Sequence, residues 1–352
     1  PNPKMVNDCP IEVCEATSLF VSETVEQHSM ASLIRMDSGR LVLSFRRGLG
    51  PTRTNDGVLC VSRSDDDGQS FSRPSTVYSY PNWDCLNLGG LMRFADNRIV
   101  LGMGRMQMDQ SLPGEEPCTA WYMTTTVSED GALSWSKPGP EIRLFPEWTE
   151  LYGASNPHQL TNGEFMLAVI GTQARDTGWQ AGVTFTSDGG ETFSPPSIVA
   201  QADGIGFGDM DLVRLPDQRF LAVARAFGGH SSVSSYSGDE GQTWTPIKST
   251  NFCGANIKLT LLKSGAILCS YRDEGKERAG VSCSLSEDAG ESWRFVGQLS
   301  ASPTTIARSP GSQCGYPDIV QMGPDTMGCV LHPYPDNEGR ITLHWLELRD
   351  RT

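Results

Sequence analysis

The residues of this chain that are best suited to chemistry stand at the ends of repeated apolar segments. Tyr316 and Asp209 begin the first strand of two such segments. The ends of the second strands carry four cationic groups: Arg46, Arg225, Arg272 and His332. A phenol has a pKa near 10, so it is a nucleophile only where a carboxylate takes its proton and cations stabilise the phenolate. The set predicts a site with Tyr316 as nucleophile and Asp209 as base.

The arginines allow two interpretations. A guanidinium binds a carboxylate through two parallel hydrogen bonds, so a group of them in a chain of net charge −14 indicates an anionic substrate. Alternatively, each arginine pairs with a nearby Asp or Glu and ties neighbouring segments together.

Six repeated units, each an apolar strand, a turn and a second apolar strand, must position these residues. They read ASLIRMDSGRLVLSFRR, LGGLMRFADNRIVLGMGR, SNPHQLTNGEFMLAVIG, MDLVRLPDQRFLAVAR, IKLTLLKSGAILCSYR and YPDIVQMGPDTMGCVLHPY. Five units precede a phrase of the form Ser/Thr-x-Asp-x-Gly-x-Ser/Thr-Trp/Phe, at 64–71, 128–135, 186–193, 237–244 and 286–293. Its Asp accepts N–H groups across a tight turn and its Gly supplies a positive φ. The second phrase has Ala132 in place of Gly, so we expect its turn to differ.

Repetition of this kind predicts an all-β fold, a six-bladed β-propeller with four short antiparallel strands per blade. We expect one domain over 1–352, in which the segment of about 1–28, including SLFVSETV, supplies the outer strand of the last blade. Hairpins return to the face from which they start, so first-strand starts and second-strand ends share one face, and the five phrases lie on the other. The site is therefore expected at the mouth opposite the phrases.

Composition limits the partners. The net charge of −14 argues against a nucleic-acid partner, and no apolar run approaches the length of a membrane span. We expect a monomer without a cofactor. No metal is expected either, because there is no CxxC pair and no His/Cys cluster with zinc spacing. The chain begins at Pro1, as a mature or trimmed product would.

Ten cysteines divide into two predicted classes. Four lie in predicted strands as small buried hydrophobes: Cys60, Cys269, Cys283 and Cys329. Six lie in predicted loops and would suit disulfides of a secreted protein: Cys9, Cys14, Cys85, Cys118, Cys253 and Cys314. Their pairing does not follow from the sequence.

The repeated phrase is similar to the Asp-box, and with it the chain resembles the sialidase superfamily of β-propellers. The segment GYPDIVQM resembles the stretch around that family's nucleophilic tyrosine, which implies this role for Tyr316. In GDMDLVRL, Asp209 stands where the family has the glutamate that acts as base. The resemblance also implies substrate-binding roles for Arg225 in LAVAR and for Arg278 ahead of the fifth phrase.

The first strand of the first blade departs from the family pattern, and so does Asp209, whose side chain is one methylene shorter than the family's glutamate. Ser29-Met30-Ala31 replaces the family's Arg-Ile-Pro, which removes the first arginine of its carboxylate-binding triad. The family's acid/base aspartate lies in the loop after the second strand of the first blade, where GLGPTRTNDG offers Asp56.

Other polar residues are expected near the mouth. His28 precedes the first strand of the first blade and suits proton transfer near neutral pH, although a lone histidine in a loop is more often only solvated. Glu150 and Tyr152 come just before the third blade and are candidates for substrate binding.

Three functions are consistent with these residues. The first is a retaining exo-glycosidase that acts on a terminal acidic sugar, sialic acid or a related uronic or ulosonic acid. The second is a polysaccharide lyase, in which arginines acidify the C–H beside a uronic acid carboxylate, and its unsaturated product would absorb ultraviolet light. The third is a propeller that binds glycans without catalysis.

Overall fold

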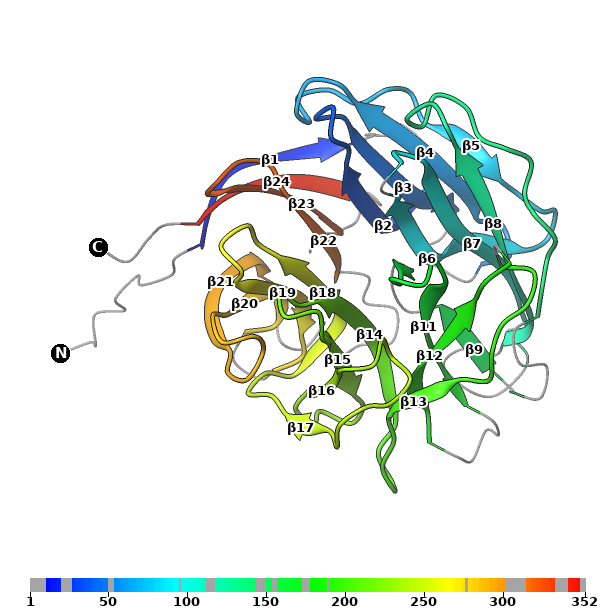
Figure 1. Cartoon of the computed structure of the whole chain (residues 1–352). Coiled ribbons are helices and arrows are strands. Elements are labelled where there is room, and N and C mark those ends of the chain that lie inside the picture. The colour runs from blue at the N-terminus through cyan, green and yellow to red at the C-terminus, as the bar shows by residue number, and fades with distance from the viewer. Residues whose placement is uncertain are drawn as a thin grey trace.

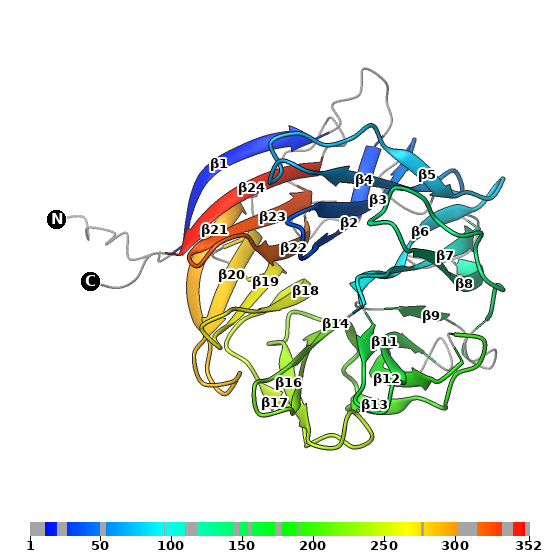
Figure 2. The ribbon, with the colours of Figure 1, turned by 45° about the horizontal axis from the view of Figure 1, so that its top comes forward.

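The computed structural model describes residues 11–19, 27–49, 54–94, 96–109, 111, 118–143, 148, 150–153, 157–172, 178–188, 190–275, 278–301, 315–332 and 341–348. These residues form a six-bladed β-propeller of antiparallel sheets without helices (Figure 1). The blades stand around a central axis (Figure 2), and the inner strands are β2, β6, β14, β18 and β22, with β9 and β10 together in blade 3. The prediction from the repeats is confirmed.

Blades 1 to 3 hold twelve strands. Blade 1 comprises β2(Gln27–Arg35), β3(Leu41–Gly48), β4(Val58–Ser64) and β5(Ser75–Tyr78). Blade 2 comprises β6(Asp84–Arg93), β7(Ile99–Met108) and β8(Cys118–Ser128), and a bridge between Met123 and Ile142 stands in place of a fourth strand. Blade 3 comprises β9(Glu150–Gly153), β10(His158–Gln159), β11(Phe165–Thr172), β12(Gln180–Thr186) and β13(Ser197–Ala200). Both β9 and β10 pair with β11.

Blades 4 to 6 each have four strands. Blade 4 comprises β14(Phe207–Arg214), β15(Phe220–Ala226), β16(Val233–Ser237) and β17(Lys248–Ser249). Blade 5 comprises β18(Gly254–Leu261), β19(Ile267–Asp273), β20(Gly280–Ser286) and β21(Arg294–Ala301). Blade 6 comprises β22(Gly315–Gln321), β23(Thr326–His332), β24(Ile341–Leu348) and β1(Ile11–Leu19). The strand nearest the N-terminus pairs with the strand nearest the C-terminus, from Ile11 with Leu348 to Leu19 with Ile341.

The five repeated phrases form turns on the face opposite the mouth, called the far face below. All five share one hydrogen-bond pattern, which the first shows at Ser64 to Ser70. The Asp66 carboxylate accepts the N–H of Ser70 at 2.9 Å and the Ser64 hydroxyl at 2.7 Å, while the Ser64 oxygen accepts the Gly68 N–H at 2.8 Å. Led by the Ser70 and Ser64 hydroxyls, these bonds lower the pKa of Asp66 to about 2. The Asp carboxylate is therefore the centre of a turn closed by its own side chains.

The second turn keeps this pattern, so the expectation that Ala132 would alter it is wrong. The Ala132 N–H donates to the Ser128 oxygen at 2.8 Å, and the Ser134 N–H donates to Asp130 at 2.9 Å. Gly131 and Ala132 have φ of 71° and 68°, and both equivalent positions of the first, fourth and fifth turns also have positive φ. Ala132 thus holds a left-handed conformation, at a cost of about 1–2 kcal/mol.

Apolar clusters hold each blade against the next. Ile267 and Tyr271 of blade 5 pack with Val213 and Leu221 of blade 4, and equivalent clusters join the other neighbours. The turn glycines allow close approach, since a Cβ on Gly241 of blade 4 would lie 2.4 Å from the Met166 sulfur of blade 3. The core is therefore distributed between the sheets rather than gathered at one centre.

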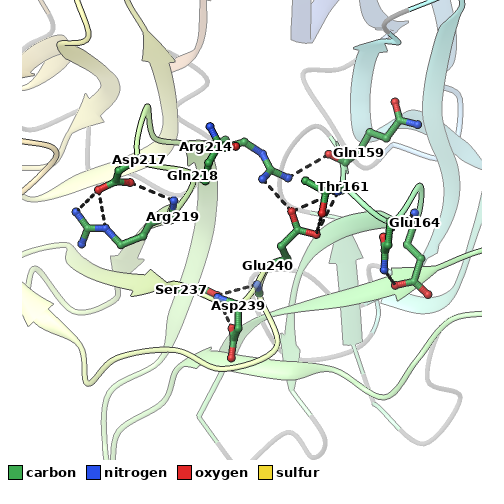
Figure 3. A network of polar contacts seen from close by, with 12 residues as sticks. Gln159, Thr161, Glu164, Arg214, Asp217, Gln218, Arg219, Ser237, Asp239 and Glu240 are labelled. Carbon is green, nitrogen blue, oxygen red and sulfur yellow. Dashed lines mark hydrogen bonds and ion pairs between the residues drawn. The ribbon is translucent and has the colours of Figure 1, made fainter.

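Polar contacts also join the blades on the far face, as at Arg214 between blades 3 and 4 (Figure 3). Its guanidinium donates to Glu240 at 2.9 Å and to the Gln159 carbonyl at 3.3 Å. Glu240 in turn accepts the Thr161 N–H and hydroxyl. This network fastens the face opposite the mouth.

Candidate active site at the mouth of the ring

The inner strands of blades 1, 4, 5 and 6 share a bulge at the mouth. In each, the residue paired with the end of the second strand is followed by a residue with positive φ. These residues are Met30 (53°), Asp209 (40°), Asn256 (51°) and Tyr316 (49°). Four non-glycine residues thus have a strained backbone at the same place in their blades. Repeated strain of this kind indicates that the bulge orients side chains for a function.

The second-strand ends also occupy equivalent places, as predicted. Ser29 pairs with Arg46, Gly208 with Arg225, Ala255 with Arg272 and Gly315 with His332. Because β18 contacts both β14 and β22, the strand that carries Asn256 lies between those that carry Asp209 and Tyr316. The ring therefore brings Asp209, Arg225, Arg272 and Tyr316 to the mouth side of three consecutive blades.

Arg225 is held between two carboxylates. It donates to Asp209 Oδ2 at 3.0 Å from Nη1, and to both oxygens of Glu274, at 2.7 Å from Nη2 and 3.2 Å from Nε. Arg272 Nη2 donates to the same Glu274 Oε1 at 3.1 Å. Burial of Arg225 disfavours its charge, but Asp209 and Glu274 outweigh it and raise its pKa. Two guanidinium and two carboxylate groups make a network of zero net charge.

Glu274 was missed by the sequence reasoning. It stands two residues after Arg272, directly after β19 ends, and its carboxylate accepts a hydrogen bond from Arg272 Nη2. A search for acidic residues directly after second-strand ends would have found it. Its presence shows that the alternative interpretation, arginines paired across blades, holds for Arg225.

Next to Tyr316, two buried polar atoms have no hydrogen-bond partner in the described part of the chain: Asn256 Oδ1 and Arg272 Nε. Both residues adjoin Gly315, where a Cβ would lie 2.5 Å from Asn256 Oδ1 and 3.4 Å from Arg272 Cβ. A buried acceptor or donor without a partner costs about 1–3 kcal/mol. A buried acceptor and a buried donor without a partner among the described residues, beside the half-buried Tyr316, are uncommon in a packed interior, and they mark this part of the mouth as a candidate functional site.

Arg46 is not placed to contact a substrate. Its side chain is 0% exposed, and Nε donates to Asp84 Oδ1 at 2.6 Å, itself 0% exposed. Nη2 donates to Thr54 at 2.7 Å and to Asp56 at 3.3 Å. The expectation that Arg46 binds the substrate anion is corrected, because its guanidinium is buried in a bridge between blades 1 and 2.

Asp56 is partly exposed on the mouth-side loop between β3 and β4, with 28% of its side chain accessible. It accepts the N–H of Leu49 at 2.8 Å, and it also accepts from Arg46 and Thr54. These donors fix the orientation of its carboxyl group.

The two histidines are also buried rather than facing a substrate. His28 lies within β2, not before it, is 4% exposed, and packs edge-on to Phe45 with ring centroids 5.3 Å apart. His332 ends β23 and is 2% exposed. The expectation that His28 and His332 contact the substrate is therefore corrected, because both side chains are buried.

Arg278 contacts the outer strand of its blade. Its side chain is 45% exposed, its Cζ lies 4.3 Å from the ring centroid of Phe295 on β21, and its Nε is 3.7 Å from Asp273. Its contact with the substrate stays a prediction. Glu150 and Tyr152 lie in β9, but their side chains are outside the described part of the structure.

Three of the cysteines expected in loops lie in strands: Cys14 in β1, Cys85 in β6 and Cys118 in β8. Cys85 and Cys118 are buried, and burial raises the pKa of the Cys85 thiol to about 12. Neither Cys85 nor the exposed Cys14 forms a disulfide, and Cys9 and Cys314 lie outside the described residues. Secretion stays a prediction.

Metal and membrane sites were sought in the same described ranges. They contain no group of three or more His, Cys, Asp or Glu side chains placed to hold a metal ion. Nor does any helix within them have the length and apolarity to cross a membrane.

Comparisons with known proteins agree with this architecture. The model of the BNR repeat-like domain family matches residues 109–329. A search of the curated proteins found no match.

Three solved structures share the fold. A protein of unknown function from Dyadobacter fermentans is 20% identical, with a TM-score of 0.79 over 97% of this chain and 100% of its own. The intramolecular trans-sialidase of Ruminococcus gnavus is 13% identical, with a TM-score of 0.66 over 92% and 96%. An α-L-arabinofuranosidase of Fusarium graminearum is 13% identical, with a TM-score of 0.63 over 92% and 93%.

Proposed function

The chain belongs to the family of BNR repeat-like domains, and from this premise we propose that it is a sialidase-like exo-glycoside hydrolase with its active site at the mouth. One observation carries the proposal. The same left-handed bulge presents Asp209 and Tyr316 from strands on either side of β18, with Arg225 ion-paired to Asp209 at 3.0 Å.

In the proposed reaction Tyr316 is the nucleophile and Asp209 the base. The Tyr316 hydroxyl passes its proton toward Asp209, directly or through water, as its oxygen bonds to the anomeric carbon. The bond from that carbon to the leaving oxygen breaks, and Asp56 protonates the leaving oxygen. Water then attacks the same carbon and gives a proton to Asp56, while the bond from that carbon to the Tyr316 oxygen breaks. Asp209 returns its proton to the Tyr316 oxygen, and the sugar leaves with retained configuration.

The surrounding groups have positioning roles. Arg225 fixes the Asp209 carboxylate, and Glu274 in turn fixes Arg225 and Arg272. The terminal sugar would bind beside Asn256 and Arg272, because Asn256 Oδ1 and Arg272 Nε are buried without a partner among the residues that the structure describes.

For the substrate we propose a terminal acidic sugar, whose carboxylate would pair with the guanidinium of Arg272, 14% of whose side chain is exposed. The neutral sum of charges over Asp209, Arg225, Arg272 and Glu274 favours a second candidate, a neutral terminal sugar. A related fold serves an α-L-arabinofuranosidase.

Fluorogenic glycosides of sialic acid, glucuronic acid and arabinofuranose test both candidates. With the substrate that is cleaved, we expect Tyr316→Phe to lower kcat by a factor on the order of 10³ or more, because the attacking oxygen is lost. The control is Tyr236→Phe, whose hydroxyl donates to the Ala289 carbonyl at 3.2 Å on the far face.

Product analysis separates this mechanism from its alternatives. Proton NMR should show the retained anomer first, and an inverted one would exclude the covalent intermediate. An unsaturated, ultraviolet-absorbing product would mean elimination. Full activity of Tyr316→Phe would remove the nucleophile from the mechanism.

A further inference from the structure

Three aromatic rings surround the guanidinium of Arg105 on blades 1 and 2. Its Cζ lies 3.7 Å from the ring centroid of Tyr80, 4.0 Å from that of Trp83 and 4.8 Å from that of Tyr122. Arg105 stands near the end of β7, and Tyr122 near the start of β8, so the cluster is on the mouth side. No role at the proposed catalytic centre accounts for this cluster.

The rings are held in place by the protein itself. Glu141 binds Arg105 through two hydrogen bonds, at 3.0 Å to Nε and 2.6 Å to Nη2. The backbone N–H of Trp83 donates to the backbone carbonyl of Tyr80 at 3.2 Å, across a turn in which Asn82 has a φ of 63°. Because Arg105 fills the space between the rings, the cluster presents outer ring faces and is not a cage for a foreign cation.

One ring of the cluster is open to solvent. Tyr80 is 45% exposed, one of the few large apolar side chains of the described residues that is exposed. It borders a shallow hollow of about 430 Å³ whose lining also includes Tyr78, Ser79, Pro138 and Glu141. An exposed rigid ring beside hydroxyl and carboxylate groups matches the two faces of a sugar, an apolar C–H face and a polar edge.

The cluster is continuous with the loop of Asp56. Asp84, directly after Trp83, pairs with Arg46, which also reaches Asp56. The Cys85 N–H donates to the Gly57 carbonyl at 3.0 Å. The rings are therefore tied to the side of the mouth that carries the proposed acid, where the leaving group would lie.

We propose that Tyr80, supported by Trp83 and Arg105, is a stacking platform for the second sugar of a glycan, the ring on the leaving side of the cleaved bond. Its place as a leaving-group subsite rests on the proposed function, whereas sugar binding does not. The substrate would then be an oligosaccharide rather than an isolated glycoside of a small alcohol.

Binding is tested without catalysis, in the Tyr316→Phe background. Lactose, cellobiose and maltose are titrated while tryptophan fluorescence and NMR saturation transfer are recorded. At least one sugar is expected to bind, and Tyr80→Ala should weaken it about tenfold, the loss of one stacking contact. Tyr80→Phe should bind as the parent does.

Leu133→Ala is the matched control, because Leu133 is 55% exposed in a far-face turn. Equal binding by the Tyr80→Ala and Leu133→Ala variants, or no binding of any of the three sugars, would overturn the platform. Near-ultraviolet circular dichroism identifies a variant in which the cluster has collapsed. In that case the NMR signals of the Tyr80 ring in the folded Tyr316→Phe parent decide: they should shift on addition of the sugar, and unchanged signals would overturn the platform.

Turnover tests the leaving-group assignment. Relative to the parent enzyme, Tyr80→Ala should lower kcat/KM about tenfold for an oligosaccharide and leave that for the methyl glycoside of the same terminal sugar unchanged. Equal loss on both substrates rejects the assignment. Sugar binding at Tyr80 in a protein without hydrolase activity would keep the platform and reject the proposed function.

Discussion

Replacing Asp84 by alanine tests the bridge between blades 1 and 2. Asp84 Oδ1 accepts from Arg46 Nε at 2.6 Å, and both side chains are 0% exposed. Removing the carboxylate leaves a buried guanidinium with part of its charge uncompensated. Loss of one partner of such a pair costs about 3–5 kcal/mol.

The structure places the expected value at the lower end of this range. Arg46 keeps Thr54 at 2.7 Å and Asp56 at 3.3 Å, and Asp56 still compensates some of its charge. We therefore expect Asp84→Ala to lower the free energy of unfolding by about 3 kcal/mol. The double variant Arg46→Met with Asp84→Leu should recover most of this loss, because a buried ion pair exchanged for apolar groups of similar volume is often neutral or stabilising.

Urea unfolding followed by fluorescence and circular dichroism measures both variants. The control is Asp96→Ala, which removes an exposed partner of Arg98, with side chains 55% and 46% accessible, and should cost less than about 1 kcal/mol. If Asp84→Ala costs no more than the control, or the double variant is less stable than the single, the pair does not have the role given to it.

Two further predictions concern stability alone. Ala132→Gly should raise the free energy of unfolding by about 1 kcal/mol, because Ala132 has a φ of 68°. Gly265→Ala should lower it by a similar amount, because Gly265 has a φ of 88° and the new Cβ would have no atom within 4 Å. Denaturation midpoints equal to that of the parent would contradict both expectations. Burial lowers the pKa of His344 to about 4, so between pH 6.5 and 4 the unfolded chain binds the proton that the folded chain does not. Stability should fall as the pH falls through this window, by up to roughly 3 kcal/mol, and His344→Gln should flatten that part of the curve of unfolding free energy against pH.

The fold was readable because its information is local and repeated. Each far-face phrase closes its own turn, as the bonds of Asp66 to Ser64 and Ser70 show, so the phrase needs no distant partner to be recognised. The error at Ala132 arose because the turn keeps its shape despite strain, and residue type alone does not show how much strain the packing will bear.

The site could be predicted only in part from the sequence. The aligned repeats predict at which end of a strand a residue lies, but not which residues of other blades it contacts. Asp209, Arg225, Arg272 and Tyr316 stand at the predicted level. Arg46 stands there too, yet Asp84 from the next blade holds it in the interior. Arg46 and Asp84 are 38 residues apart in the sequence, and the residues around each of them do not predict that the two will pair.

The paired ends of the ring also govern how the protein can fold. The ring closes only when β1 pairs with β24, from Ile11 with Leu348 to Leu19 with Ile341. During synthesis β1 therefore has no strand to pair with until β24 has been made. The five other blades pair strands that are close to one another in the sequence. The last contact to form is the one of longest range, so refolding should be limited by this closure and open rings should be the species that aggregate.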